Sequence, residues 1–330
     1  MKNILVLGGG GYVGCNLVRK LIDQGYNVIV YDLFLYKNDV FSDLKNNNKL
    51  KIIKGDIRDL NKLESILENI NILIHLACIS NDPSYELNPK LGEDINFKSF
   101  PKLINISKKH NIDQFIYASS SSVYGIKEEA SVTEDLKAEP ITDYSKFKLE
   151  CENILLNHEG NFLKTIIRPA TVCGYSERQR LDVIVNILTN HAFFNKKIII
   201  HGGEQLRPNI HIDDMSDSYI HVINNSKISD KEIFNVGDEN HSVNKLANMV
   251  NEACPDAILK KEEVLDQRSY KISSEKIYNK LGFKTKKTIK NAIDDLVEAF
   301  TKKKLVNTFG NDEFYNIKII KKKLNSLLND

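Results

Sequence analysis

The sequence has no run of 18 or more apolar residues, so it offers no candidate for a transmembrane helix. Met1-Lys2 leads directly into an apolar, strand-like run, and we therefore expect no signal peptide. The five cysteines are scattered without a CxxC pair, which argues against a disulfide framework or a zinc site and indicates reduced thiols in a cytoplasm. The formal net charge of +2 is too small to indicate a protein that binds nucleic acid or a membrane surface.

The 330 residues are enough to bury a large core, in one large domain or in two coupled ones. Strand and helix patterns alternate through the first half of the chain, which is typical of parallel strands joined by crossover helices. The alternation fades after residue 174, and no low-complexity linker marks a boundary. We predict a parallel-sheet domain over residues 1–172 with a returning segment near 231–238, and a second, coupled domain over 173–330.

Apolar runs and helical spacing define the expected elements. We predict strands over 4–7, 27–31, 51–53, 72–77, 114–118, 165–169, 197–201 and 233–236, and helices over 60–68, 89–110, 142–157 and 181–193. Asp59 is placed to cap the first of these helices. Pro101 lies inside the second, where proline costs about 3 kcal/mol, so we expect a kink or a break there.

A glycine-rich turn, Gly8–Gly14, lies between the first strand and the first helix. Glycine lets the backbone approach a pyrophosphate closely, and the N–H groups of the first helical turn point at the anion. Such turns are also common without any ligand. Asp32, at the end of the second strand, strengthens the prediction because an acidic residue there can bind an adenosine ribose.

Tyr144 and Lys148 are four residues apart and therefore share one face of a helix. A tyrosine is a poor base at neutral pH, because its reference pKa is about 10. A nearby ammonium and a nicotinamide cation would each favour the phenolate, while Ser120 could hydrogen-bond the reacting oxygen. Tyrosine and lysine at this spacing also occur by chance on many helices.

Several short motifs occur together and in order: Gly8-x-x-Gly11-x-x-Gly14, Asp32, Gly55-Asp56-Ile57, His75-Leu76-Ala77, a serine run before Val123-Tyr124-Gly125, and Tyr144-x-x-x-Lys148. They resemble the extended short-chain dehydrogenase/reductase family, specifically its nucleotide-sugar epimerases and dehydratases, from Lys2 to about Phe300. The resemblance implies an α/β fold: a Rossmann-type doubly wound parallel sheet that binds NAD, with a smaller α/β C-terminal domain for the substrate. It also implies a homodimer formed through a four-helix bundle, to which the helices starting near Pro89 and Thr142 would contribute.

The same resemblance assigns roles to individual residues. Cofactor binding falls to Gly8, Gly11, Tyr12, Val13, Gly14, Asp32, Asp56, Ile57, Leu76, Ala77, Tyr144 and Lys148. Asp32 would bind both ribose hydroxyls and repel the extra phosphate of NADP, which points to NAD. The catalytic residues would be Ser120, Tyr144 as the proton acceptor, and Lys148, which orients Tyr144 and holds the nicotinamide ribose.

The substrate implied by the resemblance is a nucleotide-diphospho-sugar. Its expected contacts are Asn81, Ser120, Ser121, Thr171, Arg178, Arg180, Arg207 and Arg268. Arginine suits the diphosphate because its planar fork meets phosphate oxygens in pairs, although each of these arginines could instead form an ion pair. Thr171 stands where galactose-type 4-epimerases have an asparagine, and the loop with Arg178 and Arg180 could compensate by reaching the diphosphate.

The reaction expected from the resemblance is epimerisation, most directly at C4 through a keto sugar. The family's 4,6-dehydratases carry Thr-Asp-Glu where this sequence has Ser120-Ser121-Ser122, which argues against dehydration. Two alternatives stay open: a 4-dehydrogenase or reductase that releases or consumes the keto sugar, and an NAD-binding protein without catalysis. The abundance of Asn, Lys and Ile suggests an AT-rich bacterial genome, which fits surface-polysaccharide biosynthesis loosely.

Other polar residues are interpreted as structural. We expect His75 to be a packed core residue close to the cofactor, and Arg168 to tie the sixth strand to neighbouring loops. Asn96 is expected near the active site, as the family's helix asparagine is. His211 and Asp213 have no third ligand at a suitable spacing in the sequence, so we predict no metal site. The last thirty residues could form an arm for oligomerisation.

Overall fold

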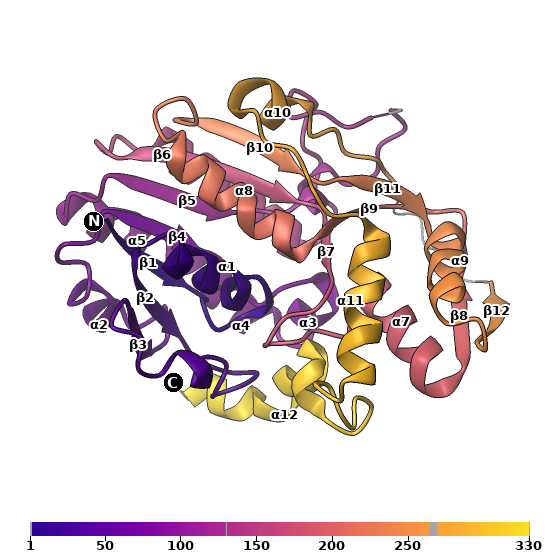
Figure 1. Cartoon of the computed structure of the whole chain (residues 1–330). Helices are drawn as coiled ribbons and strands as arrows, with labels where there is room; N and C mark the ends of the chain where they lie inside the picture. Colours follow the sequence, from indigo (N-terminus) through magenta and orange to yellow (C-terminus); the bar gives the residue numbers. More distant parts are fainter. Residues whose placement is uncertain (1, 130, 264–268, 330) are drawn as a thin grey trace.

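A sheet of seven parallel strands dominates the computed structural model, which describes residues 2–129, 131–263 and 269–329 (Figure 1). The strand order is β10-β6-β5-β4-β1-β2-β3. The strands are β1 (Asn3–Leu7), β2 (Asn27–Asp32), β3 (Leu50–Lys54), β4 (Ile72–His75), β5 (Gln114–Ala118), β6 (Leu163–Pro169) and β10 (Glu232–Val236). Consecutive strands run outward from β1 in both directions, which confirms the predicted doubly wound sheet.

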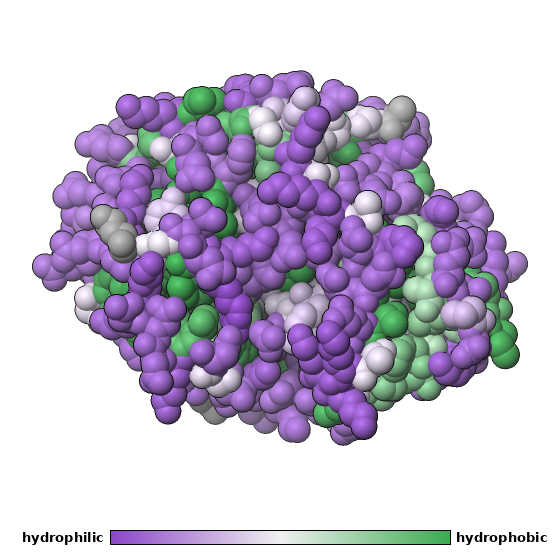
Figure 2. All heavy atoms as spheres, viewed as in Figure 1, coloured by the Kyte–Doolittle hydropathy of each residue, from purple (hydrophilic) through white to green (hydrophobic). Residues whose placement is uncertain are grey.

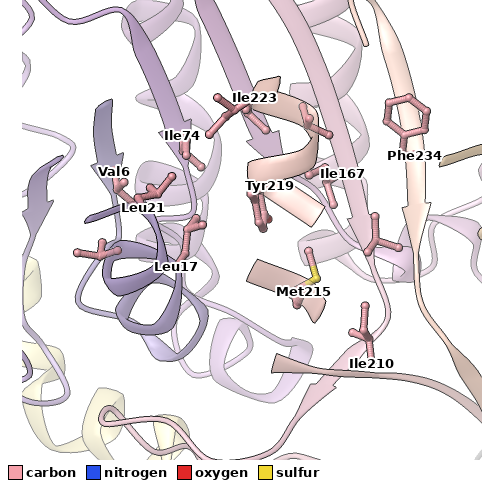
Figure 3. Close-up of a cluster of buried hydrophobic side chains, with 14 of the residues drawn as sticks. Val6, Leu17, Leu21, Ile74, Ile167, Ile210, Met215, Tyr219, Ile223 and Phe234 are labelled. Carbon is pink, nitrogen blue, oxygen red and sulfur yellow. The ribbon is translucent and has the colours of Figure 1, made fainter. Parts of the chain in front are cut away.

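Helices cover both faces of this sheet, so its central strands are apolar on both sides. One face packs against α1 (Tyr12–Asp23), α8 (Ile212–Asn224) and α10 (Glu275–Leu281). The other packs against α2 (Leu60–Glu64), α5 (Phe100–Lys109), α6 (Asp143–Asn157) and α12 (Asn316–Asn329). Figure 3 shows the first of these cores, in which Leu17 and Leu21 of α1 and Tyr219 of α8 pack near Val6, Ile74 and Ile167 of the strands.

The C-terminal half builds a smaller α/β part from two short sheets. A three-stranded sheet has the order β11-β9-β7, and a two-stranded sheet pairs β12 with β8. Their strands are β7 (Thr171–Cys173), β8 (Lys197–His201), β9 (Leu206–His211), β11 (Glu239–Ser242) and β12 (Ile258–Glu262), accompanied by α7 (Ile184–Asn195), α9 (Val243–Ala253) and α11 (Ile289–Thr301). On the face shown in Figure 2, hydrophobic residues gather over the part of the molecule that holds α7, α9 and β8.

The division of the chain between the two parts is not a single cut. Strand β10 pairs in parallel with β6 of the large sheet, where the returning segment was expected. Helices α8, α10 and α12 also pack on the large sheet, although all three lie beyond residue 173. The domain limits of 1–172 and 173–330 stay a prediction.

Two helix predictions differ from the structure. Asp59 caps α2 by accepting a hydrogen bond from the Lys62 amide, but the helix ends at Glu64 rather than at residue 68. The helix expected over 89–110 is divided into α4 (Pro89–Glu93), a π-helical turn (Asp94–Lys98) and α5. Pro101 lies in the first turn of α5, where a helix needs no N–H donor, so the break falls where proline is tolerated.

No helix within the described residues is long and apolar enough to cross a membrane.

Candidate active site

A cavity of about 520 Å³ opens at the carboxyl ends of β1 and β4, where the strand order reverses. Ligands of doubly wound sheets bind at this switch point. The predicted site residues that line it are Gly8, Gly11, Tyr12, Val13, Gly14, Asp32, Asp56, Ile57, Leu76, Ala77, Asn81, Ser120, Ser121, Tyr144, Lys148, Thr171, Arg178, Arg180 and Arg207. Arg268 lies outside the described residues.

The glycine-rich turn has no space for side chains at two positions. Gly8 has a φ of +80°, and a Cβ there would lie 2.5 Å from the backbone nitrogen of Ala77. A Cβ on Gly14 would lie 2.4 Å from the carbonyl oxygen of Gly8. Helix α1 begins after Gly11 without a hydrogen bond from a capping side chain. Its first N–H groups therefore suit an anion such as a pyrophosphate.

Asp32 ends β2 with its carboxylate fixed at the cavity wall. One carboxylate oxygen accepts a hydrogen bond from the Gly10 amide at 2.9 Å and the other from the Phe34 amide at 2.6 Å. Burial raises the pKa of Asp32, while these two amide donors act in the opposite direction. Each oxygen keeps capacity for a further donor, such as a ribose hydroxyl, and the negative charge disfavours a 2′-phosphate.

The three predicted catalytic residues lie on neighbouring elements around the cavity. Tyr144 and Lys148 project from α6, and Ser120 follows β5. The Lys148 ammonium donates a hydrogen bond to the Ala118 carbonyl at 2.7 Å and lies 5.9 Å from the centre of the Tyr144 ring. Both α6 side chains are buried. The Ala118 carbonyl at the end of β5 thus holds the Lys148 ammonium beside Tyr144, and Ser120 follows the same strand.

Burial is the largest influence on the pKa of the Tyr144 phenol. Burial raises the pKa of Tyr144 well above its usual value, and the nearby Cys78 and Asp82 raise it further. The Arg180 guanidinium and a hydrogen bond with Ser120 act in the opposite direction. A cationic nicotinamide ring in the cavity would supply the further positive charge that the phenolate needs.

Hydroxyl groups surround the reacting position predicted for the substrate. The Ser120 and Ser122 hydroxyls hydrogen-bond each other at 2.8 Å, and the Ser121 hydroxyl hydrogen-bonds the Tyr270 hydroxyl at 3.2 Å. This stretch forms a short 3₁₀ turn, Ser121–Tyr124, that places all three serines along the cavity. Hydroxyls, rather than carboxylates, therefore line this part of the wall.

The predicted substrate arginines differ in their surroundings. Arg180 forms an ion pair with Asp182 at 2.5 Å and donates a hydrogen bond to the Ser80 hydroxyl at 3.3 Å. Arg207, on β9, lines the cavity and donates a hydrogen bond to the Leu206 carbonyl at 2.9 Å. Arg178 is fully buried, with its guanidinium 4.0 Å from the centre of the Tyr36 ring.

Sequence reasoning missed the contribution of the C-terminal helix to the cavity. Asn316 and Leu327 of α12 both line it, and Ile320 packs in the core beneath the large sheet. The segment considered as an oligomerisation arm therefore packs on its own chain. The amphipathic pattern of α12 showed an apolar face, but no local signal showed that this face covers residues near the N-terminus. Tyr36 was missed because it lies in an irregular loop.

The residues interpreted as structural are buried and packed against, or bonded to, other residues. His75 is buried, stacks on Phe100 at 5.6 Å, and burial lowers its pKa to about 3. Arg168 forms a buried ion pair with Glu152 at 2.6 Å. Asn96, in the π-helical turn, hydrogen-bonds both backbone groups of Ile79 and does not line the cavity.

A third carboxylate or imidazole group lies beside His211 and Asp213 in the structure, although none has a suitable spacing in the sequence. Asp295 of α11 completes a group whose possible ligand atoms lie within 4.8 Å of one another. Both nitrogens of His211 are nevertheless engaged. Nδ1 accepts a hydrogen bond from the Asp213 amide at 3.0 Å, and Nε2 lies 3.0 Å from the Asp295 carboxylate. The group therefore caps α8 and ties it to α11, and it leaves no imidazole nitrogen for a metal.

Comparison with known proteins agrees with this geometry. The model of the NAD-dependent epimerase/dehydratase family matches residues 4–237. A UDP-glucose 4-epimerase of Lactobacillus helveticus is 27% identical over 254 residues, which cover 71% of this chain and 76% of that protein. A UDP-glucuronic acid 4-epimerase of Bacillus cereus in complex with NAD is 25% identical with a TM-score of 0.81, covering 92% of this chain and 99% of that one. A dTDP-glucose 4,6-dehydratase of Bacillus anthracis in complex with NAD shares the fold, with a TM-score of 0.81 at 19% identity over 96% of this chain and 100% of that one.

The fold and the cavity thus define an enzyme with a Rossmann-type dinucleotide site. The chain belongs to the NAD-dependent epimerase/dehydratase family, and its cofactor is NAD. The residues present fit that cofactor: the glycine turn has no space for side chains where a pyrophosphate must approach, and the Asp32 carboxylate has capacity for ribose hydroxyls.

Proposed function

We propose that this protein is a nucleotide-sugar epimerase that inverts a hydroxyl-bearing carbon, C4, through a keto intermediate. The observation that carries the proposal is that Tyr144, Lys148 and Ser120 surround the same cavity as the residues suited to NAD. The similarity to UDP-glucose and UDP-glucuronic acid 4-epimerases supports the same reaction. When bound, NAD supplies the chemistry by accepting a hydride and returning it.

In this proposal the side chains of α6 and β5 move and hold the proton. Tyr144 takes the proton of the sugar hydroxyl, and Ser120 hydrogen-bonds the oxygen while the proton leaves. Lys148 keeps a positive charge beside the phenolate because its position is fixed by the Ala118 carbonyl. Burial of Tyr144 excludes water from this step.

The proposed substrate contacts come from both halves of the chain. Arg180, Arg207 and Thr171 line the cavity, and two guanidinium groups suit a diphosphate. Asn81 lies at the start of the short helix α3 (Asp82–Tyr85), where its side chain accepts a hydrogen bond from the Ser84 amide. We propose a UDP-sugar, because the epimerases to which the chain is similar act on UDP-sugars.

Dehydration is less well supported than epimerisation. Elimination of water from C5 and C6 needs an acid and a base near those carbons, whereas Ser121 and Ser122 offer only hydroxyls there. The second candidate is a 4-dehydrogenase or reductase, because release of the keto sugar would use the same first step. The scattered cysteines support a cytoplasmic location, and we also propose a homodimer.

Product analysis separates these reactions. The purified protein is incubated with UDP-glucose, UDP-glucuronic acid and the GDP-, dTDP- and CDP-sugars, and products are identified by NMR. The expected result is a C4 epimer formed without net NADH. A ketone formed with equimolar NADH would establish the dehydrogenase instead, and a product lacking one water would contradict both.

A further inference from the structure

Arg178 is a buried cation that forms no salt bridge with a carboxylate among the described residues. The residue is 1% exposed, and its Nε has no hydrogen-bond partner. By contrast, Arg168 pairs with Glu152 and Arg180 pairs with Asp182. The side chain of Arg178 donates a hydrogen bond to the Asn316 side chain and contacts the Tyr36 ring, while Asp32 and Asp182 attract it from a longer distance. A buried charge without a carboxylate in direct contact is costly, so its presence on a cavity wall points to an anionic ligand.

The loop that carries Arg178 lies against the first turn of α1. The Tyr12 hydroxyl donates a hydrogen bond to the Gly174 carbonyl at 2.6 Å, and the Ser176 hydroxyl donates one to the Tyr12 carbonyl at 3.1 Å. Arg178 also interacts electrostatically with Asp32. The guanidinium is therefore on the glycine-rich side of the cavity, where the pyrophosphate of a dinucleotide is expected.

Helix α12 holds this loop in place. The side chain of Asn316 accepts a hydrogen bond from Arg178 and donates one to the Ser80 hydroxyl at 3.0 Å. The backbone N–H of Asn316 donates a hydrogen bond to the Asp182 carboxylate at 2.8 Å. Farther along α12, Lys323 donates a hydrogen bond to the Leu35 carbonyl at 2.5 Å. Figure 1 shows α12 passing from the C-terminal half to the loop that follows β2.

The electrostatics of Arg178 are consistent with binding of an anion. Burial, together with the neighbouring Arg180, lowers the pKa of Arg178 to about 10. The group still carries its charge at neutral pH, and a phosphate beside it would offset the desolvation that lowers the pKa.

We propose that Arg178 binds the pyrophosphate of NAD, and that the loop 174–182 and helix α12 form a clasp that retains the cofactor. This assigns Arg178 to the cofactor rather than to the diphosphate of the substrate, which was the expectation from the sequence. Arg180 donates a hydrogen bond to Ser80 and interacts electrostatically with Tyr144, so we keep its assignment to the diphosphate of the substrate. Asn316 is a positioning residue that fixes the guanidinium.

The test measures cofactor exchange in the intact holoprotein. Bound NAD is chased with deuterated NAD, and its release is followed by mass spectrometry in the wild type and in Arg178→Gln. Loss of a charge-assisted contact with phosphate predicts release about tenfold faster. The affinity of the NAD-loaded protein for UDP is measured in parallel and is expected to change by less than about twofold. Unchanged NAD release, or weaker UDP binding alone, would overturn the assignment.

A second variant keeps the proposal testable if Arg178→Gln does not fold. Asn316→Asp places a carboxylate of the same shape against Arg178, which pairs the buried charge internally and competes with the pyrophosphate. Its melting temperature should not fall, whereas NAD release should quicken. Lys322→Gln changes an exposed residue on the same helix and is the matched control. It should change neither the melting temperature nor the rate of NAD release. Wild-type NAD release from Asn316→Asp would contradict the clasp.

Competition distinguishes the phosphate contact from a general loosening of the cavity. ADP-ribose shares the pyrophosphate with NAD, so it should displace NAD equally well from Arg178→Gln and from the wild type. Adenosine lacks the pyrophosphate, so it should displace NAD more effectively from Arg178→Gln, in which only NAD has lost a contact. Displacement by adenosine that is unchanged in the variant would contradict a specific phosphate contact. None of these measurements needs sugar turnover, so they stand apart from the test of the proposed epimerase.

Discussion

Tyr144 is the residue on which the proposed chemistry depends. The Tyr144→Phe variant keeps the ring and its packing but removes the proton acceptor, so we expect turnover to fall by about a thousandfold. NAD release should stay near the wild-type rate, because the phenol is not needed to hold the pyrophosphate. Tyr85→Phe is a matched control: its ring centre lies 6.5 Å from that of Tyr144, but it does not line the cavity. Equal turnover in both variants would contradict the assignment.

We expect His75 to make the stability of the protein depend on pH. Burial and the nearby Lys148 lower its pKa to about 3, below the value of about 6.5 in an unfolded chain. Between these values the unfolded state binds the extra proton, so stability falls as the pH falls through this range.

The His75→Leu variant should lose this part of the acid sensitivity. Between pH 7 and pH 4.5, the free energy of unfolding should fall by about 2.5 kcal/mol less in the variant than in the wild type. Urea denaturation at the two pH values measures the difference. His201→Leu, at an exposed position, should show the wild-type fall. An identical fall in His75→Leu would mean that His75 is not buried in its neutral form.

Residues whose roles follow from a local motif could be predicted from the sequence. The glycines and Asp32 lie within one strand-turn-helix-strand unit, and Tyr144 and Lys148 lie within one helix, so their spacing in the sequence indicated that they are close together. Arg178 could be predicted as a residue of the site, but its environment could not, because Tyr36 and Asn316 contact it from remote parts of the chain. Distances between elements depend on packing that no local pattern encodes.

At the scale of elements, an ion pair fixes α6 against the sheet. Glu152 lies one turn beyond Lys148 and accepts two hydrogen bonds from Arg168 of β6, and it also accepts one from the Ser119 hydroxyl. Glu152→Gln would leave the Arg168 charge buried without its partner, at a cost of about 3–5 kcal/mol in the free energy of unfolding.

Denaturation by urea measures this cost against a control on the same helix. Glu150→Gln is exposed and should change the free energy of unfolding by less than about 0.5 kcal/mol. The double variant Glu152→Gln with Arg168→Met removes both charges and should recover part of the loss. A double variant no more stable than Glu152→Gln alone would contradict the unpaired charge as the cause.

Element predictions succeeded where periodicity was long and apolar, as in the strands of the large sheet. They failed where the backbone departs from regular geometry. The π-helical turn Asp94–Lys98 keeps helical residue types, so the sequence predicted one helix over 89–110 with its kink or break at Pro101, rather than two helices separated by this turn. The premature end of α2 at Glu64 likewise reflects packing, since the residues that follow do not break a helix by their type.

At the scale of the whole molecule, the homodimer stays a prediction. Helices α5 and α6 lie on one face of the large sheet, and Phe147 of α6 stacks on Phe97 at 4.8 Å while both remain partly exposed. If these helices form the interface, Phe147→Asp should convert a dimer to a monomer in sedimentation equilibrium at micromolar concentration. Phe194→Asp, an exposed position on α7, should remain dimeric. A wild-type monomer would contradict the prediction.

The cavity is lined by residues of the large sheet and of the C-terminal half, so we expect NAD binding to stabilise both parts of the molecule. A ligand that binds only the folded state at a hundred times its Kd stabilises it by about 2.7 kcal/mol, which for a chain of this size raises Tm by roughly 4 °C. NADP at the same concentration should raise Tm by less than about 1 °C, because Asp32 faces its additional phosphate. Calorimetry of cofactor-stripped protein measures both shifts, with Asp32→Asn as the variant in which the difference should narrow. Equal shifts from NAD and NADP in the wild type would show that Asp32 does not select the cofactor.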